Sequence, residues 1–144
     1  MSNPQLNSLG FHPIVEHWFK NRFAAPSPPQ KSGWPSIAAG NHTLILAPTG
    51  SGKTLAALLW SIDQLFRKSL KMDTREFDQN PSGVHTLYIS PLKALNNDIH
   101  QNLKAPLKEI GREARQSDIQ AAPIRLAVRT GDTPSHVRRS MLHK

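Results

Sequence analysis

The chain has 144 residues, enough for one domain, and contains no cysteine, which excludes a disulfide framework and a thiolate metal site. Its formal net charge is +8, and residues 100–144 carry nine basic and four acidic residues, a bias that suits contacts with a phosphate backbone but also fits solvated helix faces. Residues 1–30 lack the pattern of a secretory leader and no stretch approaches 18 apolar residues, so we expect a cytoplasmic protein.

The first predicted elements are helical. Residues 1–28 are predicted to form a polar N-terminal segment and a helix from about Pro13 to Phe23. Proline suits the first turn of this helix, and apolar residues recur at helical spacing. Residues 30–39 favour a second, short helix with Trp34 and Ile37 buried, although Pro35 weakens that prediction. Phe11 either stacks on a base or belongs to the core, and the core is the commoner place for such an aromatic residue.

Residues 42–70 combine a strand, a glycine loop and a helix. His42–Leu46 predicts a short buried strand, and apolar residues from Leu55 to Leu70 recur at helical spacing, so a helix begins at about Lys53. Between them lies a phosphate-loop pattern with alanine in place of the first glycine. Its residues are Ala47, Pro48, Thr49, Gly50, Ser51, Gly52, Lys53 and Thr54.

These residue types suit the binding of a nucleoside triphosphate. Glycine at positions 50 and 52 lets the backbone curl so that N–H groups face phosphate oxygens, and the helix start adds partial positive charge. Lys53 supplies a full charge for the outer phosphates, and the hydroxyl of Thr54 is a ligand for Mg²⁺. The alternative is an ordinary turn between a strand and a helix, but the flanking pattern favours phosphate binding.

The remainder of the chain continues the alternation of strands and helices. Strands are predicted at Val84–Ser90 and Ile124–Val128, with a helix from Leu92 to Ile110 that breaks or kinks at Pro106. Residues 112–123 read as a loop, and a last helix is predicted from Pro134 to Leu142 with Thr133 as its cap. This order indicates an α/β fold with a doubly wound parallel sheet, of which three strands covered by helices fit here.

Two turns follow the later predicted strands. Ligands bind at the carboxyl edge of open α/β sheets, so these turns are candidate nucleic-acid contacts, although capped structural turns are equally compatible with the sequence. Gln30 can read an adenine edge through its amide, but alone it reads more readily as a solvated residue. The residues of the two turns are Pro91, Leu92 and Lys93, and Thr130, Gly131, Asp132 and Thr133.

A second magnesium carboxylate is missing from the expected place. Phosphate-loop enzymes of this kind hold the metal with an aspartate after an apolar strand, and no predicted strand here ends directly in aspartate. Apart from any family, the residues leave open a phosphate-loop enzyme such as a small-molecule kinase and a non-enzymatic nucleic-acid-binding module. A GTPase is disfavoured because an Asn-Lys-x-Asp motif is absent.

Four blocks in order resemble the superfamily 2 helicases. They are Pro26-Ser27-x-x-Gln30, Ala47–Thr54, Pro91-Leu-Lys-Ala-Leu95 and Arg129-Thr-Gly-Asp-Thr-Pro134. Together with Phe11-His-Pro and Gly33-Trp-Pro, they resemble the large helicase-related (Lhr-like) DEAD/DEAH-box DNA helicases, including the ligase-associated branch. The similarity runs from about Phe11 to Leu142.

The resemblance implies a partial RecA-like domain over residues 29–144 and a role for each block. Gln30 would read adenine, residues 49–54 would hold ATP and Mg²⁺, and the turns at Lys93 and Gly131 would grip single-stranded DNA. The family's Asp-Glu box and second RecA-like domain would lie beyond Lys144. We therefore expect an N-terminal part of a helicase that alone neither hydrolyses ATP nor unwinds DNA.

Overall fold

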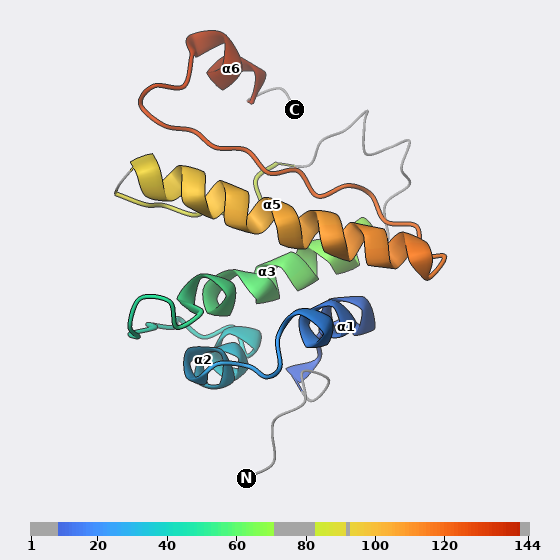
Figure 1. Ribbon diagram of the computed structural model, residues 1–144. Helices are drawn as coiled ribbons and strands as arrows, with labels where there is room; N and C mark the ends of the chain where they lie inside the picture. The colour runs from blue at the N-terminus through green and yellow to red at the C-terminus, as the bar shows by residue number, and fades with distance from the viewer. Residues whose placement is uncertain (1–8, 71–82, 92, 142–144) are drawn as a thin grey trace. The chain divides into compact units, whose positions relative to one another are not determined.

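The computed structural model describes residues 9–70, 83–91 and 93–141, with side chains for all of these except 93–97. It contains helices α1 (Pro13–Arg22), α2 (Pro28–Ala38), α3 (Lys53–Ser69), α5 (Lys93–Gln116) and α6 (Ser135–Ser140) (Figure 1). The chain divides into an N-terminal unit, Met1–Arg67, and a C-terminal unit, Lys68–Lys144, and each is described by itself. Among the described helices, none combines the length and apolar character needed to cross a membrane.

The helix predicted from Pro13 is α1, and it ends one residue before the predicted Phe23. Proline occupies its first turn, and the side chain of His12 caps it by accepting a hydrogen bond from the N–H of Ile14 at 3.2 Å. Phe23 is the C-terminal cap and leaves the helical conformation. The predicted apolar face is buried up to Phe19, which packs α1 onto the rest of the N-terminal unit.

The second predicted helix begins two residues earlier than expected, because Pro28 occupies the first turn of α2. Pro35 lies inside α2 without ending it, but the helix finishes soon afterwards at Ala38. Trp34 is completely buried as predicted, whereas Ile37 is only half-buried. Pro35 lies three residues before the end of α2 and removes one intrahelical hydrogen bond, because its ring nitrogen carries no hydrogen.

The core of the N-terminal unit is aromatic. Phe11 lies edge-on to Trp34 at 5.3 Å between ring centroids and to Trp60 at 5.2 Å, and Phe19 lies edge-on to Trp34 at 5.4 Å. Edge-to-face pairs at this separation add to the stability gained from burial. Phe11 is thereby a core residue that joins the segment before α1 to α2 and α3, and its other predicted role, stacking on a base, is not supported.

The helix predicted to start at Lys53 is α3, and its bounds match the prediction closely. Its apolar stripe is buried at positions that recur every three or four residues, so burial on one face explains why this segment is helical. The buried members of the stripe are Ala56, Leu58, Leu59, Ile62 and Phe66.

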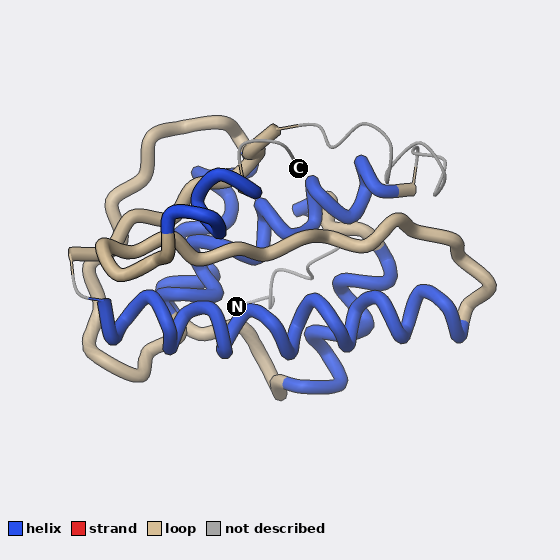
Figure 2. Tube along the Cα trace, turned by 90° about the horizontal axis from the view of Figure 1, so that it is seen from above, coloured by secondary structure: helices blue, strands red, loops and turns tan. Residues whose placement is uncertain are grey.

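The three predicted strands are not confirmed, because the described residues at these positions form irregular segments (Figure 2). His42–Leu46, Val84–Ser90 and Ile124–Val128 have no strand assignment, so the described residues show no doubly wound parallel sheet. Leu44 and Leu46 are 83% and 84% exposed, and Ile89 is 81% exposed. A strand needs a neighbour that completes its ladder hydrogen bonds, whereas an apolar run records only a preference for burial.

In the C-terminal unit, α5 runs straight through the predicted break. It has 24 residues with Pro106 in its interior, and it ends at Gln116 instead of Ile110, so part of the predicted loop at 112–123 is helix. Leu103, Ile110 and Ala114 are buried along one stripe. This apolar stripe continues on both sides of Pro106, and its burial offsets the hydrogen bond that the proline cannot donate.

The segment after α5 runs back along this helix (Figures 1 and 2). The reversal occurs at Asp118, which has φ of 56°, and the N–H of Ile119 bonds to the carbonyl of Ala114 at 2.9 Å. This is the six-to-one bond of a Schellman cap, with aspartate where glycine is usual. The last helix, α6, begins at Ser135 and has Pro134 as its cap, so the predicted capping by Thr133 is wrong.

Candidate nucleotide-binding site

The predicted phosphate loop lies at the start of α3. Gly50 and Gly52 have φ of +79° and +88°, left-handed values that side chains other than glycine adopt at a cost. The N–H of Ser51 bonds to the carbonyl of Pro48 at 3.3 Å, which closes the turn before the helix. The two glycines are therefore required by the shape of the loop, as the sequence pattern predicted.

The ammonium group of Lys53 is held by its own loop. Its Nζ donates to the carbonyl oxygens of Ala47 at 2.5 Å and Pro48 at 2.6 Å. These neutral oxygens accept from a charged donor, and phosphate oxygens with their negative charge would compete for the same donor. The lysine is thus anchored beside the loop, in reach of any anion that the loop binds.

Gln30 is built into the same site from α2. Its Oε1 accepts a hydrogen bond from the N–H of Ser27 at 2.9 Å, and its Nε2 donates to the carbonyl of Gly52 at 3.4 Å. The side chain is buried, with 5% of the residue exposed. Gln30 therefore contacts the phosphate loop, which lies 22 residues further along the chain. The alternative prediction, a solvated loop glutamine, is wrong because the residue is buried.

Two buried hydroxyl groups mark this site as suited to a polar ligand. The Oγ atoms of Ser27 and Ser51 are buried and, within the described part of the chain, have no hydrogen-bond partner. A buried hydroxyl without a partner costs free energy, and a bound polar group relieves that cost. The residues present thus fit a phosphorylated ligand. Sequence reasoning did not assign Ser27 to the site, although the Ser-x-x-Gln spacing of a capping box was a signal for it.

Gly52 also sets the space at the centre of the site. A Cβ atom added there would lie 2.8 Å from Nε2 of Gln30 and 3.0 Å from Oγ of Ser27. A Cβ added at Gly50 would meet no atom within 4 Å. Gly52 is therefore confined by its neighbours, whereas Gly50 faces open space.

The other predicted loop residues lie just before α3 or in its first turn. Thr49 and Gly50 form an exposed turn, and Thr54 stands in the first turn of α3, half-buried. The first N–H groups of a helix have no intrahelical partner, so the segment that begins at Lys53 offers free donors to an anion. Thr54 would hold Mg²⁺ through its hydroxyl in the position that the motif requires.

The first predicted nucleic-acid turn is only partly described. Pro91 is exposed, and Lys93 is the first residue of α5. Leu92 and the side chain of Lys93 lie outside the described residues. The prediction for this turn therefore rests on its place at a helix start.

The second predicted turn, Thr130–Thr133, is held by its own hydroxyls. The N–H of Thr130 bonds to Oγ1 of Thr133 at 2.8 Å, which uses the hydroxyl that was predicted to cap α6. Arg138 donates through Nε to the carbonyl of Thr133 at 2.7 Å, and its other nitrogen contacts the carbonyls of Thr130 and Gly131. Arg138 thus fixes the turn from behind, and Asp132 is exposed at its tip.

A buried carboxylate that the sequence analysis did not single out lies on α3. Asp63 is completely buried and accepts a hydrogen bond from the N–H of His12 at 2.6 Å and another from Nε of Arg67 at 2.7 Å. Arg67 also donates to the carbonyl of Gly10. Burial lowers the pKa of His12 and the charge of Arg67 adds to this, while Asp63 acts in the opposite direction. The sequence did contain a signal for this residue, since Asp63 is a carboxylate within the apolar stripe of α3.

Comparison with known proteins links these features to a family. Residues 27–139 match the DEAD/DEAH box helicase family. The chain is 47% identical over 132 residues to the Lhr helicase/probable uracil glycosylase of Mycolicibacterium smegmatis, and 43% identical over 139 residues to the Lhr helicase/uracil glycosylase of Escherichia coli. The alignments cover 92% and 94% of this chain, which spans 8% and 9% of the two relatives.

A solved structure agrees with these matches. The structure of Mycobacterium smegmatis helicase Lhr bound to ssDNA and AMP-PNP matches 94% of this chain and 16% of its own chain, at 46% sequence identity and a TM-score of 0.81. The fold is thus that of RecA-like helicase domains. Because the match to the family takes in the residues from Ser27 to Gln30, the phosphate loop and the turn at Thr130, this chain belongs to the DEAD/DEAH box helicase family.

Proposed function

We propose that this chain forms the nucleotide-binding start of the first motor domain of an ATP-dependent DNA helicase, over residues 29–144. The proposal depends on one observation: the side chain of Gln30 bonds to Gly52 of the phosphate loop, and the side chain of Lys53 bonds to the same loop. A glutamine amide can both donate to and accept from an adenine edge, and a phosphate loop beside it is the partner that ATP requires. A small-molecule kinase needs no such amide next to its phosphate loop, so that alternative is not favoured.

Each residue of the site has a role in this proposal. Gln30 reads the adenine ring, residues 47–53 hold the phosphates, and the hydroxyl of Thr54 holds Mg²⁺. Bound here, ATP would supply the phosphoanhydride bond whose hydrolysis drives a helicase. Single-stranded DNA contacts the turns at Pro91–Lys93 and Thr130–Thr133, since backbone N–H groups and hydroxyls in turns suit phosphate oxygens. Support comes from the relative of known structure, which was solved with ssDNA and AMP-PNP.

The irregular segments have a place in this proposal. Their exposed apolar residues are those expected of buried parallel strands, and we assign them to the sheet of the complete motor domain. Because the chain spans 8% to 16% of the relatives described above, ATP hydrolysis and unwinding belong to the proposal for the whole protein.

Nucleotide competition tests the proposal. The affinity of the 144-residue chain for Mg–ATP and Mg–GTP is measured for the wild type, for Gln30→Ala and for Gln116→Ala, which removes an exposed glutamine from the end of α5. We expect the wild type and Gln116→Ala to prefer ATP, and Gln30→Ala to lose that preference by about tenfold, the value of roughly one good hydrogen bond. A wild-type preference for GTP, or equal effects of the two variants, contradicts the proposal.

A further inference from the structure

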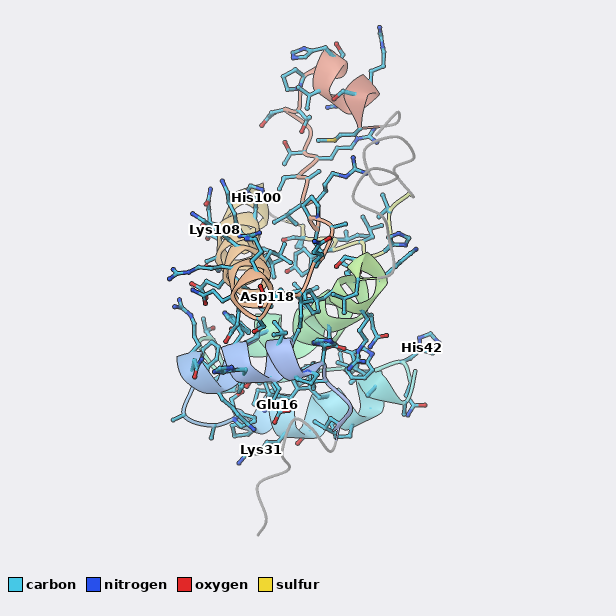
Figure 3. The ribbon with its side chains drawn as sticks, turned by 90° about the vertical axis from the view of Figure 1, so that its right-hand side faces the viewer. Glu16, Lys31, His42, His100, Lys108 and Asp118 are labelled. Carbon is cyan, nitrogen blue, oxygen red and sulfur yellow. The ribbon has the colours of Figure 1, made fainter. Side chains whose placement is uncertain are left out.

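The exposed side of α5 carries a row of cations. Lys104, Lys108, Arg112 and Arg115 are all exposed, and His100, half-buried, stands one turn before them. At about 100° per residue, the four exposed residues fall within roughly 80° of the helix circumference. Figure 3 labels His100 and Lys108 on the outer side of α5. We call the four exposed residues the α5 basic row.

The acidic residues of α5 lie on its other flank. Asp98, Glu109 and Glu113 fall about 120° to 180° around the helix from Lys104, and the buried stripe through Leu103 and Ile110 separates the two flanks on the remaining side. A helix face that is merely solvated usually intersperses the two signs, since opposite charges one turn apart stabilise each other. Of the four cations, only Arg112 has an acidic residue of α5 one turn away, Glu109, so positive charge predominates along this line.

The length of the row suits a polyanion. From Lys104 to Arg115 the helix rises by about 16 Å, a length that spans more than one phosphate of a nucleic-acid strand. Successive cations one turn apart, such as Lys104 and Lys108, stand about 6 Å apart along the axis. Gln101 lies on the same flank and is exposed, so it adds a hydrogen-bond donor to the row.

A membrane surface fits the row less well. Helices that bind anionic lipid present large apolar side chains beside their basic residues. Among the described side chains of α5, none of the large apolar ones is exposed. A purely polar, cationic flank matches a phosphate backbone, which offers charge without apolar surface.

We propose that the α5 basic row is a nucleic-acid contact additional to the turns at Pro91–Lys93 and Thr130–Thr133. Lys93 opens the same helix, so a strand held at that turn can continue along the row. The contact is with phosphates and is therefore independent of base sequence. The identity of the polyanion as nucleic acid rests on the proposed function, whereas the position of the contact rests on the charge arrangement of α5.

Salt dependence of DNA binding tests this proposal. Anisotropy of a fluorescein-labelled single-stranded oligothymidine is measured with the 144-residue chain at increasing NaCl. For Lys104→Gln combined with Lys108→Gln we expect the slope of log K against log[NaCl] to become shallower by about 1.4, the value for two lost contacts with a single strand. Circular dichroism should be unchanged, because both side chains are exposed.

A charge-relocation variant separates position from net charge. Lys104→Asn combined with Asn102→Lys keeps the composition but moves one cation about 160° around α5, onto the acidic flank. We expect the slope to fall by about 0.7 relative to the wild type. A slope equal to that of the wild type overturns the proposal, because binding would then follow net charge alone.

Two further measurements complete the test. If the wild type shows no salt-dependent DNA binding, or if the row is needed for binding to phosphatidylserine vesicles and not to DNA, the proposal is wrong. Lys53→Ala should leave the salt slope unchanged, which supports a contact separate from the nucleotide site. If the chain shows no preference for ATP while the row variants lose DNA binding, the proposed nucleotide function is wrong. The proposal that the α5 basic row contacts nucleic acid is then still supported.

Discussion

The backbone N–H of His12 donates to the carboxylate of Asp63 at 2.6 Å, a contact that joins residues 51 positions apart. The carboxylate is completely buried and also accepts hydrogen bonds from Arg67 and Gln64. Since α3 begins at the phosphate loop, this contact ties the segment before α1 to the helix that carries Lys53. The N-terminal residues are thereby part of the scaffold of the nucleotide site.

Removing the Asp63 carboxylate should destabilise the N-terminal unit. Asp63→Ala leaves the N–H of His12 without its partner and Arg67 without its counter-ion, so we expect a loss of about 3 kcal/mol in the free energy of unfolding. Urea unfolding followed by tryptophan fluorescence reports this loss, because all three tryptophans lie in this unit. Asp98→Ala, at an exposed position on α5, should change stability by no more than about 0.5 kcal/mol. Similar effects of the two substitutions would refute the assigned role of Asp63.

The cap of α1 should make stability depend on pH. The pKa of His12 is lowered in the folded chain, chiefly by burial, so between its folded pKa and about 6.5 the unfolded chain binds the additional proton. The contribution of His12 is therefore complete above about pH 6.5 and is lost as the pH falls through this window. His12→Asn keeps a capping side chain that does not titrate. The variant should lose less stability than the wild type between pH 7.5 and 5.5, and identical losses would exclude His12 as the source.

The two glycines of the loop should tolerate alanine differently. Gly52→Ala forces a Cβ to within 2.8 Å of Gln30 and also strains the backbone, whereas Gly50→Ala strains the backbone only. We expect both variants to lose about 1 kcal/mol through the left-handed conformation, and Gly52→Ala to lose about 1–2 kcal/mol more through the clash. Urea unfolding measures both losses. Equal losses would show that the space between Gly52 and Gln30 is not as confined as described.

The turn after α5 offers a stabilising substitution. Asp118 has φ of 56° at the position where a Schellman cap usually has glycine, so Asp118→Gly should stabilise the chain by about 0.5–1 kcal/mol. Among the described residues other than glycine, Asp118 alone has a positive φ, so Ser117→Gly serves as the control and should destabilise. Urea unfolding followed by circular dichroism measures both changes. A destabilising effect of Asp118→Gly would mean that the aspartate side chain stabilises the turn.

Local patterns in the sequence were enough to predict the helices and the phosphate loop. The stripe from Leu55 to Phe66 predicts α3 because helix hydrogen bonds form within the segment and burial of one face needs no knowledge of the partner. The phosphate loop is likewise local, since its shape depends on Gly50 and Gly52. Pro106 was misleading because burial of the α5 stripe outweighs one lost hydrogen bond.

Long-range relationships were harder to predict. The strand predictions rested on apolar runs such as Leu44–Leu46, and pairing depends on which segment lies alongside, information that one segment does not contain. Nothing local shows that Asp63 meets His12, or that Gln30 meets Gly52. The family resemblance assigned Gln30 and the phosphate loop to one nucleotide site, but both contacts were found only in the structure.

Binding of Mg–ATP to the loop is the most direct test of the account. In ¹H–¹⁵N NMR spectra of the 144-residue chain, we expect the amide signals of Gly50, Gly52, Lys53 and Thr54 to shift together with a single dissociation constant. Lys53→Ala should weaken that binding by about 10- to 100-fold, as expected for loss of a charged hydrogen-bond donor. Unchanged affinity in Lys53→Ala, or shifts that leave these four amides unaffected, would contradict the assignment of this loop to the phosphates of ATP.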